Sequence, residues 1–185
     1  PDGTKETKLE AKDEVIQEIH TARGTLRKTF RHHHPIKPPV TNVEELKIFL
    51  ELWKGARYEW NDDTVEYQRL NGMIGEHGLS LRFWGPSTIP RLLEYEMGTE
   101  GFYYLLQDEP ALMDEVIKTL HEKDLIAFEH LVRSPFETVV LCENTSTTYI
   151  SPDIYRRYNG PQVRDFVDIV HSAGKIAIIH MCGHI

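Results

Sequence analysis

Apolar residues recur along the chain with two different periods, and these periods predict an alternation of helices and strands. Two β-prone runs on either side of Gly24 predict a hairpin over about residues 13–30. Asn42 is expected to cap the first of several helices, because its side chain accepts hydrogen bonds from free backbone amides. The helices are expected at 43–56, 62–77, 89–95, 98–106, 110–132 and 153–172.

Three further apolar runs predict strands at 79–84, 138–142 and 175–182. The last two runs are continuously apolar, which is typical of strands buried on both faces of a parallel sheet. The order of strands and helices indicates βαβ units, so we expect an α/β fold. A (β/α)-barrel and an open doubly wound sheet both fit this pattern. No glycine-rich phosphate loop follows any of the strands, which disfavours a nucleotide-binding sheet.

Composition and charge narrow the class of protein. A chain of 185 residues is long enough for one domain, and we expect a single domain over 1–185. The net charge of -8 argues against a nucleic-acid partner. No apolar stretch is long enough to cross a membrane, and residues 1–12 do not resemble a secretory signal. With only two cysteines, a cytoplasmic location is expected, and both chain ends are expected to be fragment boundaries.

The segment His180-Met181-Cys182-Gly183 carries the strongest chemical signal. Side chains alternate along a strand, so His180 and Cys182 are expected on one side, at the carboxyl end of a parallel strand. An imidazole and a thiolate together suit zinc. The alternative is a packed thiol and a hydrogen-bonded histidine. Two ligands do not complete a zinc site, so a third is expected beyond Ile185 or from elsewhere in the protein.

The preceding strand ends in Cys142-Glu143-Asn144, which is expected at the same edge of the sheet. Glu143 is a candidate metal ligand, general acid or base, or substrate-orienting group. The alternative is a solvated carboxylate at a strand end. Cys142 lies in the other phase of that strand, and we expect it to pack in the core. Asn144 is a candidate substrate-binding residue.

Other residues give weaker signals. Arg82 is a candidate for binding an anionic substrate group, although an ion pair with a nearby carboxylate explains it equally well. Tyr149 and Tyr155 are expected to line a pocket. The three consecutive histidines at 32–34 cannot all face one ion, so we expect a surface patch there.

Several of these segments together resemble the uroporphyrinogen decarboxylase superfamily, which includes cobalamin-dependent methyltransferases. The His180–Gly183 segment is the most specific match. The other matching segments are Trp84-Gly85-Pro86-Ser87, Asp108-Glu109-Pro110, residues 149–155 and His171-Ser172-Ala173-Gly174-Lys175, with a weaker match at 21–26.

The resemblance implies a (β/α)8 TIM barrel, of which residues 1–185 are an incomplete N-terminal and middle portion. In the methyltransferase branch, a His-x-Cys pair and a later Cys bind zinc, and His180 and Cys182 match that pair. The resemblance therefore implies a zinc- and corrinoid-dependent methyltransferase. It would move a methyl group between methylcobalamin and a thiol or other acceptor, with Glu143 beside the metal. Its partners would be a corrinoid protein and a small methyl donor or acceptor.

Two alternatives stay open. One is a metal-free uroporphyrinogen decarboxylase of porphyrin biosynthesis, which requires cationic residues around its pocket. The arginine-rich substrate motif of those enzymes is not visible in residues 1–24. The other is a non-catalytic barrel relative. An interrupted barrel would expose sheet edges and apolar faces, so we also expect a homo-oligomer or a longer chain.

Overall fold

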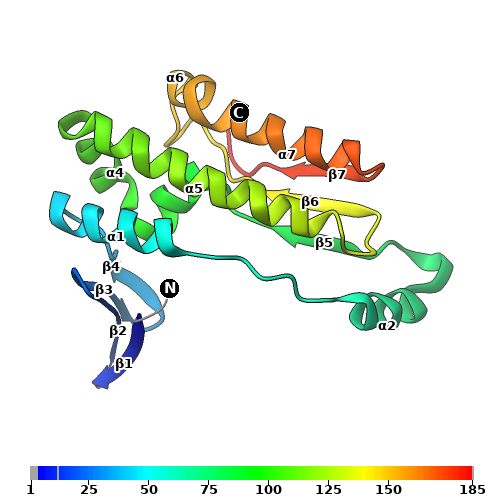
Figure 1. Ribbon diagram of the computed structural model, residues 1–185, viewed down its shortest axis with the longest axis horizontal. Coiled ribbons are helices and arrows are strands. Elements are labelled where there is room, and N and C mark those ends of the chain that lie inside the picture. The colour runs from blue at the N-terminus through cyan, green and yellow to red at the C-terminus, as the bar shows by residue number, and fades with distance from the viewer. Residues whose placement is uncertain (1–3, 12, 185) are drawn as a thin grey trace. The chain divides into compact units, whose positions relative to one another are not determined.

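The computed structural model describes residues 4–11 and 13–184, and the chain divides into two compact units (Figure 1). The first unit consists of Pro1–Arg57 and Arg91–Leu120, and the second of Tyr58–Pro90 and His121–Ile185. The long helix α5 (Pro110–Leu131) contributes its first half to the first unit and its second half to the second. The expectation of a single domain stays a prediction.

The first unit contains an antiparallel sheet with the strand order β1-β2-β3-β4. Strands β2 (Glu14–Thr21) and β3 (Gly24–Arg31) form a hairpin, where the sequence predicts one over 13–30. Strands β1 (Lys5–Ala11) and β4 (His34–Lys37) extend the sheet on either side of it.

The helices of the first unit follow the apolar periodicity. Helix α1 (Val43–Gly55) begins after Asn42, whose side-chain oxygen accepts a 2.9 Å hydrogen bond from the amide of Glu45, so the predicted cap is confirmed. The buried face of α1 consists of Leu46, Phe49 and Leu50. A π-helical turn, η2 (Leu92–Glu96), and helix α4 (Gly98–Asp108) complete this unit.

The second unit contains a parallel sheet with the strand order β5-β6-β7. Its strands are β5 (Leu81–Trp84), β6 (Thr138–Cys142) and β7 (Ile176–His180). Helix α7 (Gly160–Ser172) lies along this sheet (Figure 1). The other helical elements are α2 (Thr64–Ile74), η1 (Gly75–His77), α3 (Thr88–Arg91), α6 (Pro152–Ile154) and the π-helical turn η3 (Tyr155–Asn159).

Helices cover one face of the parallel sheet. Val139 and Leu141 of β6 pack there against Phe128 of α5 and against Phe166 and Val170 of α7. These five side chains are at most 1% exposed. Burial of this apolar cluster is the main stabilising contribution that can be assigned to the second unit.

The prediction that the last strand is buried on both faces is wrong. Strand β6 is buried throughout, except that Cys142 is half-buried, but β7 alternates between exposed and half-buried positions. Ile176 and Ile178 are 58% and 41% exposed, and Phe83 of β5 is 58% exposed. These three residues form what we call the open face. The reason is that β7 is an edge strand. Among the described residues, only the helix-facing side chains of β7 pack against the apolar cluster.

Within the described residues the parallel sheet is open, with β5 and β7 as its two edges. The architecture is therefore mixed α/β, as predicted, whereas a closed (β/α)8 barrel is not formed by these residues. No helix among them combines the length and the apolar character needed to cross a membrane.

Candidate functional site

The candidate residues lie at the carboxyl edge of the parallel sheet. Strands β6 and β7 run in the same direction, and their last residues, Cys142 and His180, are in register. The ladder continues one step further, because the amide of Glu143 donates a 2.8 Å hydrogen bond to the carbonyl of His180. This edge is where parallel α/β folds generally place ligand-binding groups.

His180 and Cys182 are in contact. The Sγ atom of Cys182 lies 2.8 Å from Nε2 of His180, and both residues are exposed. The alternation that predicted a shared side therefore brings the two side chains together. Gly183 turns the chain after them with φ +98°, and a Cβ at this position would lie 2.7 Å from Oγ of Ser146. A glycine is needed at this turn.

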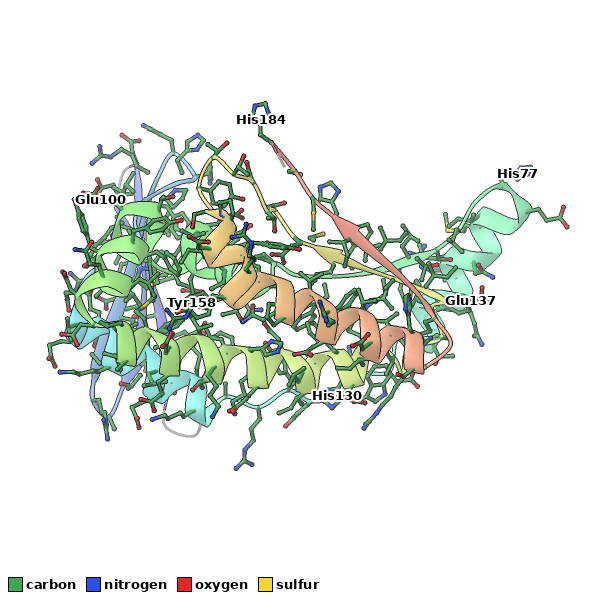
Figure 2. The ribbon with its side chains drawn as sticks, turned by 90° about the horizontal axis from the view of Figure 1, so that it is seen from above. His77, Glu100, His130, Glu137, Tyr158 and His184 are labelled. Atoms are coloured by element: carbon green, nitrogen blue, oxygen red, sulfur yellow. The ribbon has the colours of Figure 1, made fainter. Side chains whose placement is uncertain are left out.

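The pair does not by itself complete a metal site. In the part of the chain that the structure describes, no group of three or more His, Cys, Asp or Glu residues is placed to hold a metal ion. His184 projects at the end of the described chain, beyond β7 (Figure 2). Two side chains are fewer than the three or four protein ligands that a zinc site takes.

Cys142 was predicted to pack in the core, but it is only half-buried and lies beside His180. Its register with His180 puts its side chain on the same face of the sheet. Burial raises the pKa of the Cys142 thiol, and the nearby Cys182 raises it further. Cys142 therefore stays protonated at neutral pH more fully than an ordinary thiol, which makes it a poor nucleophile.

Glu143 is completely buried, with 0% of its surface exposed, so the alternative of a solvated carboxylate is wrong. Its Oε1 accepts hydrogen bonds from Nδ2 of Asn159 at 2.6 Å and from Oγ1 of Thr145 at 3.2 Å. Glu143 continues the alternation of Val139 and Leu141, which face the helices. It therefore lies at the same edge of the sheet as His180 but on the covered side.

Burial raises the pKa of Glu143, while the hydrogen bonds from Asn159 and Thr145 and the nearby Ser87 oppose that shift. The carboxyl group therefore holds its proton to a higher pH than a solvated glutamate does. A carboxyl group whose pKa is raised by burial carries a proton that it can donate as a general acid.

Sequence reasoning missed Asn159, which donates the shorter of these two hydrogen bonds to Oε1 of Glu143. Asn159 is 0% exposed and ends the π-helical turn η3, directly before α7. The widened turn places its side chain over the end of β6, and π-helical turns often occur at functional sites. No feature of the sequence distinguishes such a turn from an ordinary helix start, so there was no signal to find it.

The backbone turn at Gly85, directly after β5, brings Ser87 near Glu143. Gly85 has φ +125°, and a Cβ there would lie 2.7 Å from the carbonyl oxygen of Cys142. Only glycine lets the chain leave β5 this close to the end of β6.

The remaining candidates are not gathered with the pair. Arg82 lies on the same face of β5 as Trp84, which packs on the helix-covered side. The Nε atom of Arg82 lies 3.4 Å from Oδ2 of the buried Asp63. Asn144 and Tyr149 lie in the loop after β6, where the Tyr149 hydroxyl donates to the Asn144 carbonyl. The histidines at 32–34 are exposed, as a surface patch requires.

We predict that Glu143→Gln removes a pH dependence of stability. Because the pKa of Glu143 is raised in the folded chain, its contribution to stability is present below its ordinary value of 4.5 and is lost as the pH rises through the folded pKa. Each unit of pKa difference corresponds to about 1.4 kcal/mol. Glutamine keeps an oxygen for Asn159 but cannot ionise. Urea midpoints between pH 4 and 8 measure the effect, and the exposed Glu129→Gln is the control. Identical pH profiles for wild type and Glu143→Gln would contradict the assignment.

The comparisons with known proteins point to a fold. No family model matches the chain, and no curated protein sequence matches it. Among solved structures, the chain is similar to a methyltransferase from Methanosarcina mazei, with a TM-score of 0.50 and 13% identity. The match covers 85% of this chain and 43% of the other, so the chain spans less than half of the length of that structure. This chain therefore shares its mixed α/β fold with part of a methyltransferase structure.

Proposed function

We propose that the chain is part of a zinc- and corrinoid-dependent methyltransferase, with His180 and Cys182 as two of the zinc ligands. The observation that carries this proposal is the 2.8 Å contact between Sγ of Cys182 and Nε2 of His180 at the carboxyl edge of a parallel sheet. The similarity in fold to a methyltransferase supports it.

The donor set fits zinc. An imidazole nitrogen and a thiolate sulfur are common zinc ligands, and sulfur disfavours magnesium and calcium. Both side chains are exposed, so an ion reaches them without disturbing the core. We propose that the further ligand is a cysteine supplied from outside the described residues. Zinc at this position would lower the pKa of a bound thiol and hold it as a thiolate at neutral pH.

The open face fits the proposal that the whole protein is a (β/α)8 barrel of the uroporphyrinogen decarboxylase type. Phe83, Ile176 and Ile178 project from the side of the sheet that carries Cys142 and His180. In a closed barrel this side faces the interior, where bulky apolar residues fill the core. Closure by further strands, in the same chain or in another copy, would remove these side chains from water.

The residues around the pair have separate roles in this proposal. His180 and Cys182 bind the metal, while Glu143, held by Asn159 and Thr145, stores a proton on the covered side of the same edge. Asn144 and Tyr149 shape the loop beside the edge, where the substrate is expected. Arg82 forms an ion pair with Asp63 and has no role in substrate binding in this proposal. A corrinoid protein would present methylcobalamin to the exposed edge, and the two free cysteines suit the reducing cytoplasm.

Methyl transfer to a thiol tests this function. The whole protein that contains this chain is loaded with one equivalent of zinc and incubated with methylcobalamin and a small thiol under anaerobic conditions, and the methylated thiol is quantified. We expect product with wild type and a rate at least about 100-fold lower with Cys182→Ser, because ligand loss costs more than the 10–100-fold typical of outer-sphere changes. Metal-free decarboxylation of uroporphyrinogen, with no methyl transfer, would instead favour the decarboxylase.

A further inference from the structure

A second feature of the carboxyl edge is a pocket in the loops that follow β6 and β7. Its volume is about 370 Å³, which is in the range of small-molecule sites. We call it the loop pocket and define it by its walls, which are Thr145, Thr147, Ile150, Pro152, Tyr155 and Met181, with Arg156 at the side. All of these residues belong to the second unit.

The loop pocket touches both groups of candidate site residues. Met181 lies in the chain between His180 and Cys182, which are in contact through their side chains. Thr145 forms another wall, and its hydroxyl donates to Oε1 of Glu143. A ligand in the pocket would therefore contact the segment that carries His180 and Cys182. It would also contact Thr145, whose hydroxyl group separates the pocket from the buried Glu143 carboxyl group.

The lining favours a flat apolar ligand. Ile150, Pro152, Tyr155 and Met181 provide an aliphatic chain, two rings and a thioether, which are surfaces that pack well on aromatic rings. Tyr155 is held in place by close packing, since a Cβ on Gly160 would lie 3.4 Å from its Cε1. The threonine hydroxyls give the lining a small number of hydrogen-bonding groups, as in typical ligand pockets.

The charges at the pocket favour an uncharged ligand. Arg156 is the cation in its lining, and Nη1 of Arg156 lies 2.7 Å from Oδ1 of Asp153. The Asp153 carboxylate offsets the charge of the guanidinium group, so the pair has no net charge that would favour an anionic or a cationic ligand.

We propose that the loop pocket binds a compact, uncharged aromatic molecule that carries one hydrogen-bonding group. Binding of such a molecule goes beyond the proposed function. Its role as the body of a methyl donor or acceptor rests on that function.

Benzyl alcohol is the probe, and cyclohexylmethanol and benzoate are the comparisons for aromaticity and charge. Binding to the full chain is measured by ligand-observed NMR titration. We expect saturable binding of benzyl alcohol with a dissociation constant on the order of millimolar, as suits a molecule of its size. Thr147→Trp, which places an indole at the pocket wall, should weaken binding at least tenfold. Thr148→Trp is the matched control, because Thr148 is exposed next to Thr147 but does not line the pocket.

Three results would overturn the proposal: no saturable binding of benzyl alcohol, equal binding by the Thr147→Trp chain, or tighter binding of benzoate or cyclohexylmethanol. A zinc titration on the same samples keeps the two proposals separate. Benzyl alcohol binding without zinc binding would uphold the pocket and contradict the methyltransferase function. Zinc binding without benzyl alcohol binding would contradict the pocket proposal and leave the methyltransferase proposal standing.

Discussion

Cys182→Ser is expected to weaken zinc binding by at least about 100-fold, because it removes a coordinating sulfur, whereas changes to groups outside the ligand shell typically cost 10–100-fold. A serine hydroxyl at this position is a harder and weaker ligand than a thiolate. His180→Ala should cause a loss of the same order, since its Nε2 is the atom in contact with Sγ of Cys182. Competition against a chromophoric chelator at constant pH measures each affinity.

Cys142→Ser is the matched control for this experiment. It removes the chain's other thiol from the same face of the sheet, at the position paired in register with His180, and should change zinc affinity by less than a few-fold. An equal loss in Cys142→Ser and Cys182→Ser would show that zinc does not distinguish the two sulfurs. The proposed ligand assignment would then fail.

Phe166→Ala is expected to destabilise the second unit by about 3–5 kcal/mol, the usual cost of deleting a fully buried phenylalanine ring. The Phe166 side chain is 0% exposed, and its ring meets that of Phe128 edge-on with centroids 5.1 Å apart. The ring lies between α7 and β6, so its loss leaves a cavity beneath β6, the strand that ends directly before Glu143. Amide hydrogen exchange should show the loss of protection in α7 and β6.

Phe83→Ala is the matched control for this stability experiment, because it is the same substitution in the same unit at a ring that is 58% exposed. In this chain by itself, where Phe83 is exposed, we expect a change within about 0.5 kcal/mol, as for ordinary surface substitutions. A large loss of protection in Phe83→Ala would mean that the open face is covered in solution, for instance by another copy of the chain.

Much of the fold could be predicted from local patterns. The spacing of Leu46, Phe49 and Leu50 predicted α1, and Asn42 predicted where it begins. The run Thr138–Cys142 predicted β6 to the residue. These predictions succeeded because hydrophobic periodicity and capping are set by neighbours a few positions apart. The charged run at 5–11 gave no such signal, so β1 was missed.

The candidate site could be predicted only in part. Strand alternation was enough to bring His180 and Cys182 together, because both lie on one short segment. It did not predict the burial of Glu143 or its hydrogen bond with Asn159, the last residue of η3, which lies 16 positions further along the chain. The exposure of Ile176 and Ile178 was missed for a related reason. An apolar strand has the same sequence whether or not its second face is covered.

The most direct test of zinc binding by His180 and Cys182 is the X-ray absorption spectrum of zinc bound to the chain at one equivalent. With His180 and Cys182 as ligands, it should show a sulfur scatterer at about 2.3 Å together with imidazole nitrogen at about 2.0–2.1 Å. The sulfur signal should disappear in Cys182→Ser. A spectrum with nitrogen and oxygen scatterers alone, such as zinc on the histidines at 32–34 would give, would contradict the proposed site.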